Sequence, residues 1–158
     1  MMTQRERRKI ARRNAFRYQS YREEVRRYRA DYLSTLRSPR TDAMPGSSSA
    51  GSHSSPTEYY GIRLADMPES LRQKWKWVKA IEDAWSECLN EDAGDRHGLA
   101  FLLEKNFRLT GETSDDDHNS EVRETIMKES GISLATFYNR LEVVTDILVY
   151  HAAKRGLL

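Results

Sequence analysis

The sequence contains a single cysteine, Cys88, among its 158 residues. One cysteine cannot form a disulfide within the chain or build a cysteine-rich metal site. The four histidines are scattered without the spacing of metal ligands, and no apolar run approaches the roughly 20 residues that span a bilayer. The basic N-terminus lacks a following apolar stretch, so no secretory signal is predicted. We therefore expect a protein of a reducing, cytoplasmic setting without a membrane partner.

The sequence also lacks the residue groups that enzymes use. No paired carboxylates, nucleophile–base set or glycine-rich phosphate loop stands out. Three adjacent acids, Asp115 to Asp117, precede His118, but they lack the glycine-spaced loop of a calcium site and serve equally well as a solvated loop. The sequence predicts a non-enzyme that carries no metal and no cofactor.

The charges are divided unequally along the chain. Residues 1–40 hold 13 Lys and Arg against 4 Asp and Glu, whereas residues 41–158 hold 13 against 20, so a net charge of only +2 hides a basic arm and an acidic body. A basic arm favours polyanions, with nucleic acid first and an anionic membrane surface second.

The arm is expected to be one continuous helix over residues 3–37, because no Gly or Pro occurs before Ser38 and strong helix formers dominate. A heptad seam can be placed on it, in which Asn14 would fix the register. Tyrosine fills four of the seven seam positions, which are Ala11, Asn14, Tyr18, Tyr21, Val25, Tyr28 and Tyr32.

Three interpretations of the arm stay open. It can form a coiled coil that makes the protein a homo-oligomer through this helix, it can lie along DNA phosphates, or it can be a solvated helix that packs on nothing. The first two are compatible, since a paired seam can carry basic outer faces. The densest basic patch consists of Arg5, Arg7, Arg8, Lys9, Arg12 and Arg13. A tyrosine-rich apolar face makes membrane binding the weakest choice.

Composition divides the chain into an arm (1–37), a linker (38–57) and a helical body (58–158). The linker is rich in Ser, Gly and Pro, which predicts flexibility. The body is expected to open a helix at Asp66-Met67-Pro68-Glu69, with Asp66 as the cap, and to continue it to about Asn90. Its predicted buried stripe leaves Trp77 outside and comprises Leu71, Trp75, Val78, Ile81, Trp85 and Leu89.

A third helix is predicted over about Arg96 to Leu109, stopped by Thr110-Gly111. Its expected core face comprises Leu99, Leu102, Leu103 and Phe107.

The segment from Glu121 to Arg155 predicts a helix-turn-helix. Gly131 can adopt the left-handed conformation that ends a helix, and Ser133 can cap the next one. The following helix has one face to bury, formed by Phe137, Leu141, Val144 and Leu148. The fold class is therefore all-α: a long basic N-terminal helix, a flexible linker and a C-terminal four-helix domain with the helix-turn-helix.

The first turns of the last helix carry small, polar, aromatic and basic side chains, the types that read bases in the major groove. The expected base-contacting residues are Ser133, Ala135, Thr136, Tyr138, Asn139 and Arg140. Lys128 and Arg123 are expected to contact phosphates. An ordinary helical hairpin within a bundle is the alternative for the same pattern.

Three features of the chain resemble the phage late-gene transcriptional activators of the RinA/ArpU type. The first is an Arg-rich helix that leads into a polar Pro/Gly/Ser linker. The second is the segment FLLEKNFRLTG ahead of the last helices. The third is GISLATFYNRLEVVTDIL, similar to the Ile-Ser-x-x-Thr-aromatic-x-Arg signature shared with sigma-factor region 4, although Leu134 stands where a basic residue is common. The signature is carried here by Ile132, Ser133, Thr136, Phe137, Tyr138, Arg140 and Leu141.

The resemblance implies a regulator that binds double-stranded DNA near a late promoter in the bacterial host cytoplasm and contacts RNA polymerase. Two other classes stay open. One is a small-terminase-like phage packaging or assembly protein, in which the coiled coil builds a ring. The other is a protein-interaction adaptor that uses the helix of Trp75, Trp77 and Trp85.

Overall fold

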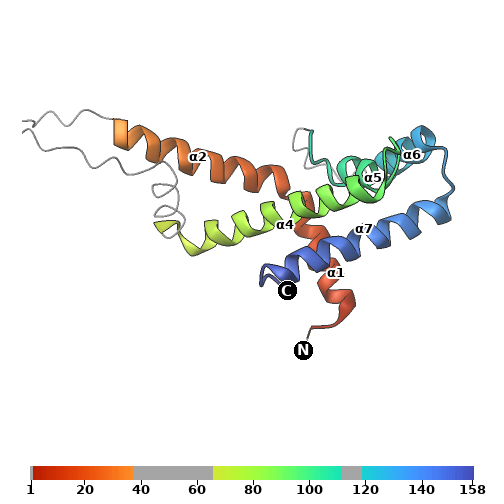
Figure 1. Ribbon diagram of the computed structural model, residues 1–158, viewed down its shortest axis with the longest axis horizontal. Helices are drawn as coiled ribbons and strands as arrows, with labels where there is room; N and C mark the ends of the chain where they lie inside the picture. Colours follow the sequence, from red (N-terminus) through yellow and green to blue (C-terminus); the bar gives the residue numbers. More distant parts are fainter. Residues whose placement is uncertain (1, 38–65, 112–118) are drawn as a thin grey trace, which may run out of the picture.

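The computed structural model describes residues 2–37, 66–111 and 119–158. Within these ranges every helix or strand assigned is a helix, so the predicted all-α class is confirmed (Figure 1). The predicted linker 38–57, the start of the body and the acidic segment 112–118 lie outside the described residues. The helices are α1 (Gln4–Phe16), α2 (Tyr18–Arg37), α4 (Glu69–Glu91), α5 (Leu99–Phe107), α6 (Asn119–Ser130) and α7 (Leu134–Lys154).

The basic arm is bent at Arg17, so the single helix predicted over residues 3–37 is wrong at this point. The cause is the side chain of Asn14, whose Nδ2 donates to the Ile10 carbonyl at 2.9 Å while its Oδ1 accepts from the Tyr21 hydroxyl at 2.9 Å. A polar side chain that enters the helical hydrogen-bond ladder bends it. Figure 1 shows α1 and α2 leaving the bend in different directions.

The seam of the arm packs on the same chain. Helix α2 lies antiparallel on α4, with Tyr18 at Glu82 (Oη to Oε1, 3.4 Å) and Glu24 paired with Lys74, while α1 crosses α7. Five seam residues are buried in these contacts: Ala11, Asn14, Tyr18, Tyr21 and Val25. The heptad therefore identified a buried face correctly. Pairing between two copies through this face stays a prediction, and it would have to displace α4.

Helix α4 buries only part of the predicted stripe. Val78 and Ile81 are buried as predicted, and Leu71, Trp75 and Trp85 are half-buried. Trp77 is 8% exposed and belongs to the core, whereas Leu89 is 58% exposed. The reason is that α4 packs against α5 and α7 as well as α2, which turns its buried face toward Trp77, Ile81, Ala84 and Cys88. Because Tyr18, the first residue of α2, lies opposite Glu82, α2 no longer covers α4 at Leu89.

The start of α4 and both ends of α5 differ from prediction, whereas α4 ends at Glu91, close to the predicted Asn90. Pro68 precedes α4 without any side-chain cap, so Asp66 is not the cap. Helix α5 begins at Leu99 instead of Arg96 because the Asp92 carboxylate accepts from the amides of Leu99 (2.6 Å) and Ala100 (2.8 Å). It ends at Phe107 instead of about Leu109, because Arg108 takes the left-handed φ of +54° and ends the helix before the predicted stop at Thr110-Gly111. The predicted core residues Leu102, Leu103 and Phe107 are buried.

The arm and the body share one hydrophobic core, in which Ala11, Ala15, Tyr18 and Tyr21 pack with residues of α4, α5 and α7. Phe16 stacks edge-on against Phe107 at the end of α5, with ring centroids 4.9 Å apart. The α4–α7 pair is antiparallel, since His151 meets Glu87 and Arg155 meets Asp83. The first turn of α7 therefore lies toward the C-terminal end of α4 (Figure 1).

Candidate nucleic-acid interface

The bend between α6 and α7 has the predicted form. Gly131 has φ +64°, and the Ile132 amide donates to the Met127 carbonyl at 3.2 Å, five residues back. This is the hydrogen bond of a Schellman helix end, which needs a left-handed residue at the position of Gly131. Ser133 then caps α7, because its Oγ accepts from the Thr136 amide at 3.2 Å. The predicted bend is confirmed.

One face of α7 anchors the helix in the core. Phe137 is 2% exposed, Val144 is fully buried and Leu148 is 1% exposed, with Leu141 beside them. Helix α6 contributes Ile126 to the same core and packs on α5. The first turns of α7 are therefore fixed in orientation by the residues predicted for that purpose.

The opposite side of these turns faces outward. Leu134 and Tyr138 are each 47% exposed, Ser133, Ala135 and Asn139 are exposed, and Thr136 is half-buried. None of the predicted base-contacting residues is sealed in the core. A rigid helix with an exposed, chemically varied N-terminal face is the geometry that enters a major groove.

Arg123, one of the two predicted phosphate contacts, lies beside this face. Arg123 of α6 donates from Nη1 to the Tyr138 hydroxyl at 3.0 Å, so it stands directly beside α7. Lys128 is exposed one turn further along α6. The structure thus brings Arg123 to the candidate surface through a contact that sequence spacing did not reveal.

Arg140 has a role that the sequence did not predict. Its Nη1 donates to the backbone carbonyl of His97 at 2.9 Å, and this bond ties α7 to the loop before α5. The His97 ring in turn packs edge-on against Phe101, with centroids 4.9 Å apart. Arg140 therefore positions α7, and any base contact must come from the rest of its guanidinium.

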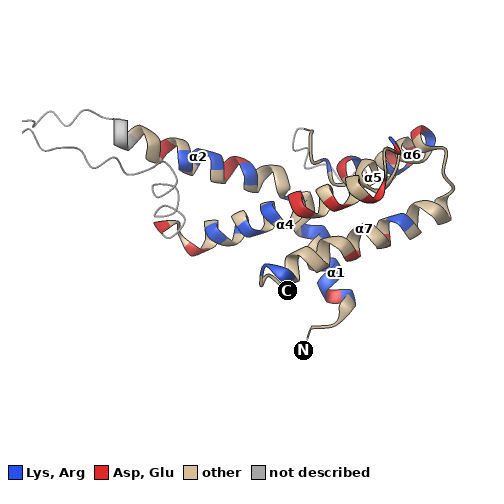
Figure 2. Cartoon of the chain, viewed as in Figure 1, with Lys and Arg blue, Asp and Glu red and all other residues tan. Residues whose placement is uncertain are grey.

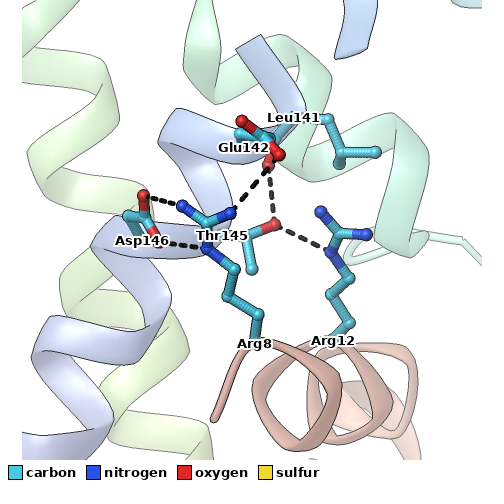
Figure 3. Close-up of polar contacts among 6 residues, drawn as sticks. All are labelled: Arg8, Arg12, Leu141, Glu142, Thr145 and Asp146. Carbon is cyan, nitrogen blue, oxygen red and sulfur yellow. Dashed lines mark hydrogen bonds and ion pairs between the residues drawn. The ribbon is translucent and has the colours of Figure 1, made fainter. Parts of the chain in front are cut away.

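Two arginines of the arm contact α7 directly (Figure 3). Arg8 makes a forked pair with Asp146, from Nε at 2.7 Å and from Nη2 at 2.6 Å, and reaches Glu142 at 3.3 Å. The hydrogen bond to Asp146 raises the pKa of the Arg8 guanidinium, which stays charged. Arg12 donates from Nε to the buried Thr145 hydroxyl at 3.0 Å, which donates to the Leu141 carbonyl.

The Arg8 pair changes the charge of the candidate surface. Ala135, Asn139, Glu142 and Asp146 recur at helical spacing, so the two acids extend the outward face of α7 beyond Asn139. Uncompensated carboxylates there would repel phosphates. The guanidinium of Arg8 offsets one of these two negative charges. This helical period was visible in the sequence, but only the structure shows that the arm supplies the compensating cation.

The rest of the predicted basic patch is divided between solvent and the protein. Arg5, Lys9 and Arg13 are exposed, and Arg7 is half-buried. Arg8 and Arg12 are engaged with α7. Half of the six positions therefore remain open to an external phosphate without any rearrangement.

The described residues offer no metal-binding cluster of three or more His, Cys, Asp or Glu. Cys88 is fully buried, and burial raises the pKa of its thiol to about 12, so it is not a thiolate nucleophile at neutral pH. No described helix combines the length and apolar character needed to cross a membrane.

Comparisons of the chain with protein-family models, with curated proteins and with solved structures give no match.

Proposed function

We propose that this protein is a sequence-specific DNA-binding regulator that reads bases with the first turns of α7. One observation carries the proposal: Phe137 and Val144 hold α7 in the core while Ala135, Tyr138 and Asn139 face outward. An asparagine amide can bond an adenine edge at two points, a tyrosine offers a hydroxyl and a ring, and an alanine can contact a thymine methyl.

In this function, Arg123 and Lys128 contact phosphates beside the groove, and Arg8 offsets one of the two negative charges that Glu142 and Asp146 place on the outer face of α7. The resemblance to the RinA/ArpU-type activators supports the same proposal, with RNA polymerase as a second partner at a late promoter. The three tryptophans give little support to an adaptor, because Trp77 is buried and the cations of Arg29 and Lys79 lie over Trp75.

Selection of bound duplexes from a random pool tests the proposal. The wild-type protein should enrich one site. Asn139→Ala should weaken binding to that site by about 1–3 kcal/mol and leave binding to a scrambled duplex unchanged. The matched control is Ala153→Ser, an exposed position at the other end of α7, which should change neither affinity.

No enrichment from the pool, or an equal affinity of the Asn139 variant for the selected site, would refute base reading by α7. Light scattering on the same samples separates the packaging alternative, since a large ring would indicate a small-terminase-like assembly instead of a regulator.

A further inference from the structure

On the antiparallel helices α2 and α4, here called the α2–α4 hairpin, positive charges gather on one side, away from the first turn of α7. Figure 2 shows Lys and Arg interspersed with acids along α2, Lys and Arg on the N-terminal half of α4 after an acid at its start, and acids on the C-terminal half of α4.

The basic residues gather on one flank of the hairpin. Arg29 of α2 and Lys79 of α4 both lie over the Trp75 ring, at 4.4 Å and 4.6 Å from its centroid. Other bases share the flank by helical spacing of three and four residues. This basic flank consists of Arg22, Arg26 and Arg29 on α2 and Arg72, Lys76 and Lys79 on α4.

The acids of the hairpin are mostly elsewhere. Glu24 and Asp31 fall on the opposite side of α2 by helical register, and Glu24 is paired there with Lys74. Three acids meet the basic flank: Glu69, at Arg72 (3.3 Å), Glu82, at Lys79 (2.7 Å), and Asp83, which follows Lys79 by four residues and is paired with Arg155. Since Arg155 matches Asp83, six cations against the other two acids leave an excess of positive charge, and all six side chains are exposed or half-buried.

We propose that the basic flank is a second DNA-contacting surface, which binds the phosphate backbone of a duplex without reading its sequence. The inference deepens the proposed function by naming where the nonspecific affinity comes from. A linear array of cations fits the regularly spaced phosphates of a duplex. An anionic membrane fits less well, because the apolar group at its centre is one tryptophan already covered by two cations.

The basic flank lies too far from the first turn of α7 to contact the same bases. The flank lies on the N-terminal half of α4, whereas the first turn of α7 lies near the other end of the antiparallel α4–α7 pair. At 1.5 Å per residue the two surfaces are about 40 Å apart, slightly more than one turn of duplex. The flank therefore contributes contacts outside the bases that α7 reads.

The test measures how affinity depends on salt, on a duplex of about 30 base pairs that extends past the selected site. The variant Arg22→Gln/Arg26→Gln/Arg29→Gln removes three charges from the flank. It should lose about tenfold or more in affinity at low salt, equally for selected and scrambled duplexes, and its salt slope should fall by about 2 to 3.

Two further variants serve as controls. Arg17→Gln/Arg27→Gln/Lys154→Gln removes the same charge from exposed positions that belong to neither surface and should keep the wild-type slope. Replacing the three flank arginines by lysine keeps the charge and should restore binding. Circular dichroism melting of each variant checks the fold.

The outcomes separate the two proposals. A flank variant that keeps the wild-type slope overturns the second surface while base reading by α7 stands. A slope that depends on the flank, without any sequence preference, supports the second surface and refutes base reading. No duplex binding at low salt overturns both. Tighter flank-dependent binding to vesicles of one part phosphatidylserine to three parts phosphatidylcholine than to the duplex overturns DNA as the partner.

Discussion

At the scale of single residues, Gly131 makes the bend between α6 and α7 through its backbone alone. Its φ is +64°, and a Cβ atom placed there would meet nothing within 4 Å. Any cost of a side chain at this position is therefore conformational strain and not a clash. The orientation of α7, and with it the candidate interface, depends on that one left-handed residue.

Gly131→Ala should lower the free energy of unfolding by about 1–2 kcal/mol, because an alanine is strained in the left-handed region. Urea unfolding measures the change. Gly111→Ala is the matched control, since Gly111 is equally open but its φ is not positive, and it should change stability little. Equal effects of the two substitutions would contradict the strain account.

The ionisation of the Cys88 thiol makes the free energy of unfolding depend on pH in the alkaline range. Burial raises the pKa of its thiol from 9.0 to about 12, so the folded state holds this proton more tightly than the unfolded state. The contribution is fully present below pH 9 and is lost as the pH rises toward 12. Cys88→Ala should therefore show a shallower fall in unfolding free energy between pH 8 and pH 10.5 than the wild type. Parallel profiles of unfolding free energy against pH for the two proteins would contradict a contribution from Cys88.

At the scale of elements, the bend between α1 and α2 depends on a buried hydrogen bond between Tyr21 and Asn14. Tyr21→Phe leaves the Asn14 oxygen without its donor and should cost about 1–3 kcal/mol. Adding Asn14→Leu should recover part of that loss, since an apolar pair needs no donor. Denaturant unfolding of the wild type, both single variants and the double variant measures the coupling between Tyr21 and Asn14. Losses of unfolding free energy that simply add in the double variant would contradict this coupling.

Elements with local signals were predictable from the sequence. The α6–α7 bend depends on Gly131 and Ser133, and both act on neighbouring backbone atoms. The anchor face of α7 follows from a regular spacing of Phe137, Leu141 and Val144. The seam of the arm was found for the same reason, because helical periodicity marks a buried face whichever partner covers it.

Features that depend on distant partners were not predictable. The buried face of α4 is set by three neighbouring helices at once, so Trp77 entered the core and Leu89 did not. Helix α5 is capped by Asp92, seven residues before Leu99, which no short capping motif indicates. At the interface, the contacts of Arg8 with Asp146 and of Arg140 with His97 join segments that only tertiary packing brings together.

At the scale of the whole molecule, the arm completes the core of its own chain. Val25 is 2% exposed at the seam, so Val25→Ala should lower the free energy of unfolding by about 2 kcal/mol. The loss should be the same at protein concentrations a hundredfold apart, because the partner helix belongs to the same chain. Arg27→Ala, on the exposed side of α2, is the control. A midpoint that rises with protein concentration would indicate that the seam pairs two copies.

The two proposed surfaces differ in charge in the way that their proposed roles require. The first turns of α7 offer varied side chains and little net charge, which suits base reading. The basic flank of the α2–α4 hairpin offers positive charge without variety, which suits phosphates.

Photocrosslinking from α7 tests the central claim most directly. Tyr138 and Tyr150 lie on the same helix and are 47% and 58% exposed, so either can be replaced by p-benzoylphenylalanine without loss of the core. On the selected duplex, the probe at position 138 should crosslink to DNA and the probe at position 150 should not. Crosslinking from position 150 alone, or equally from both, would contradict base reading by the first turns of α7.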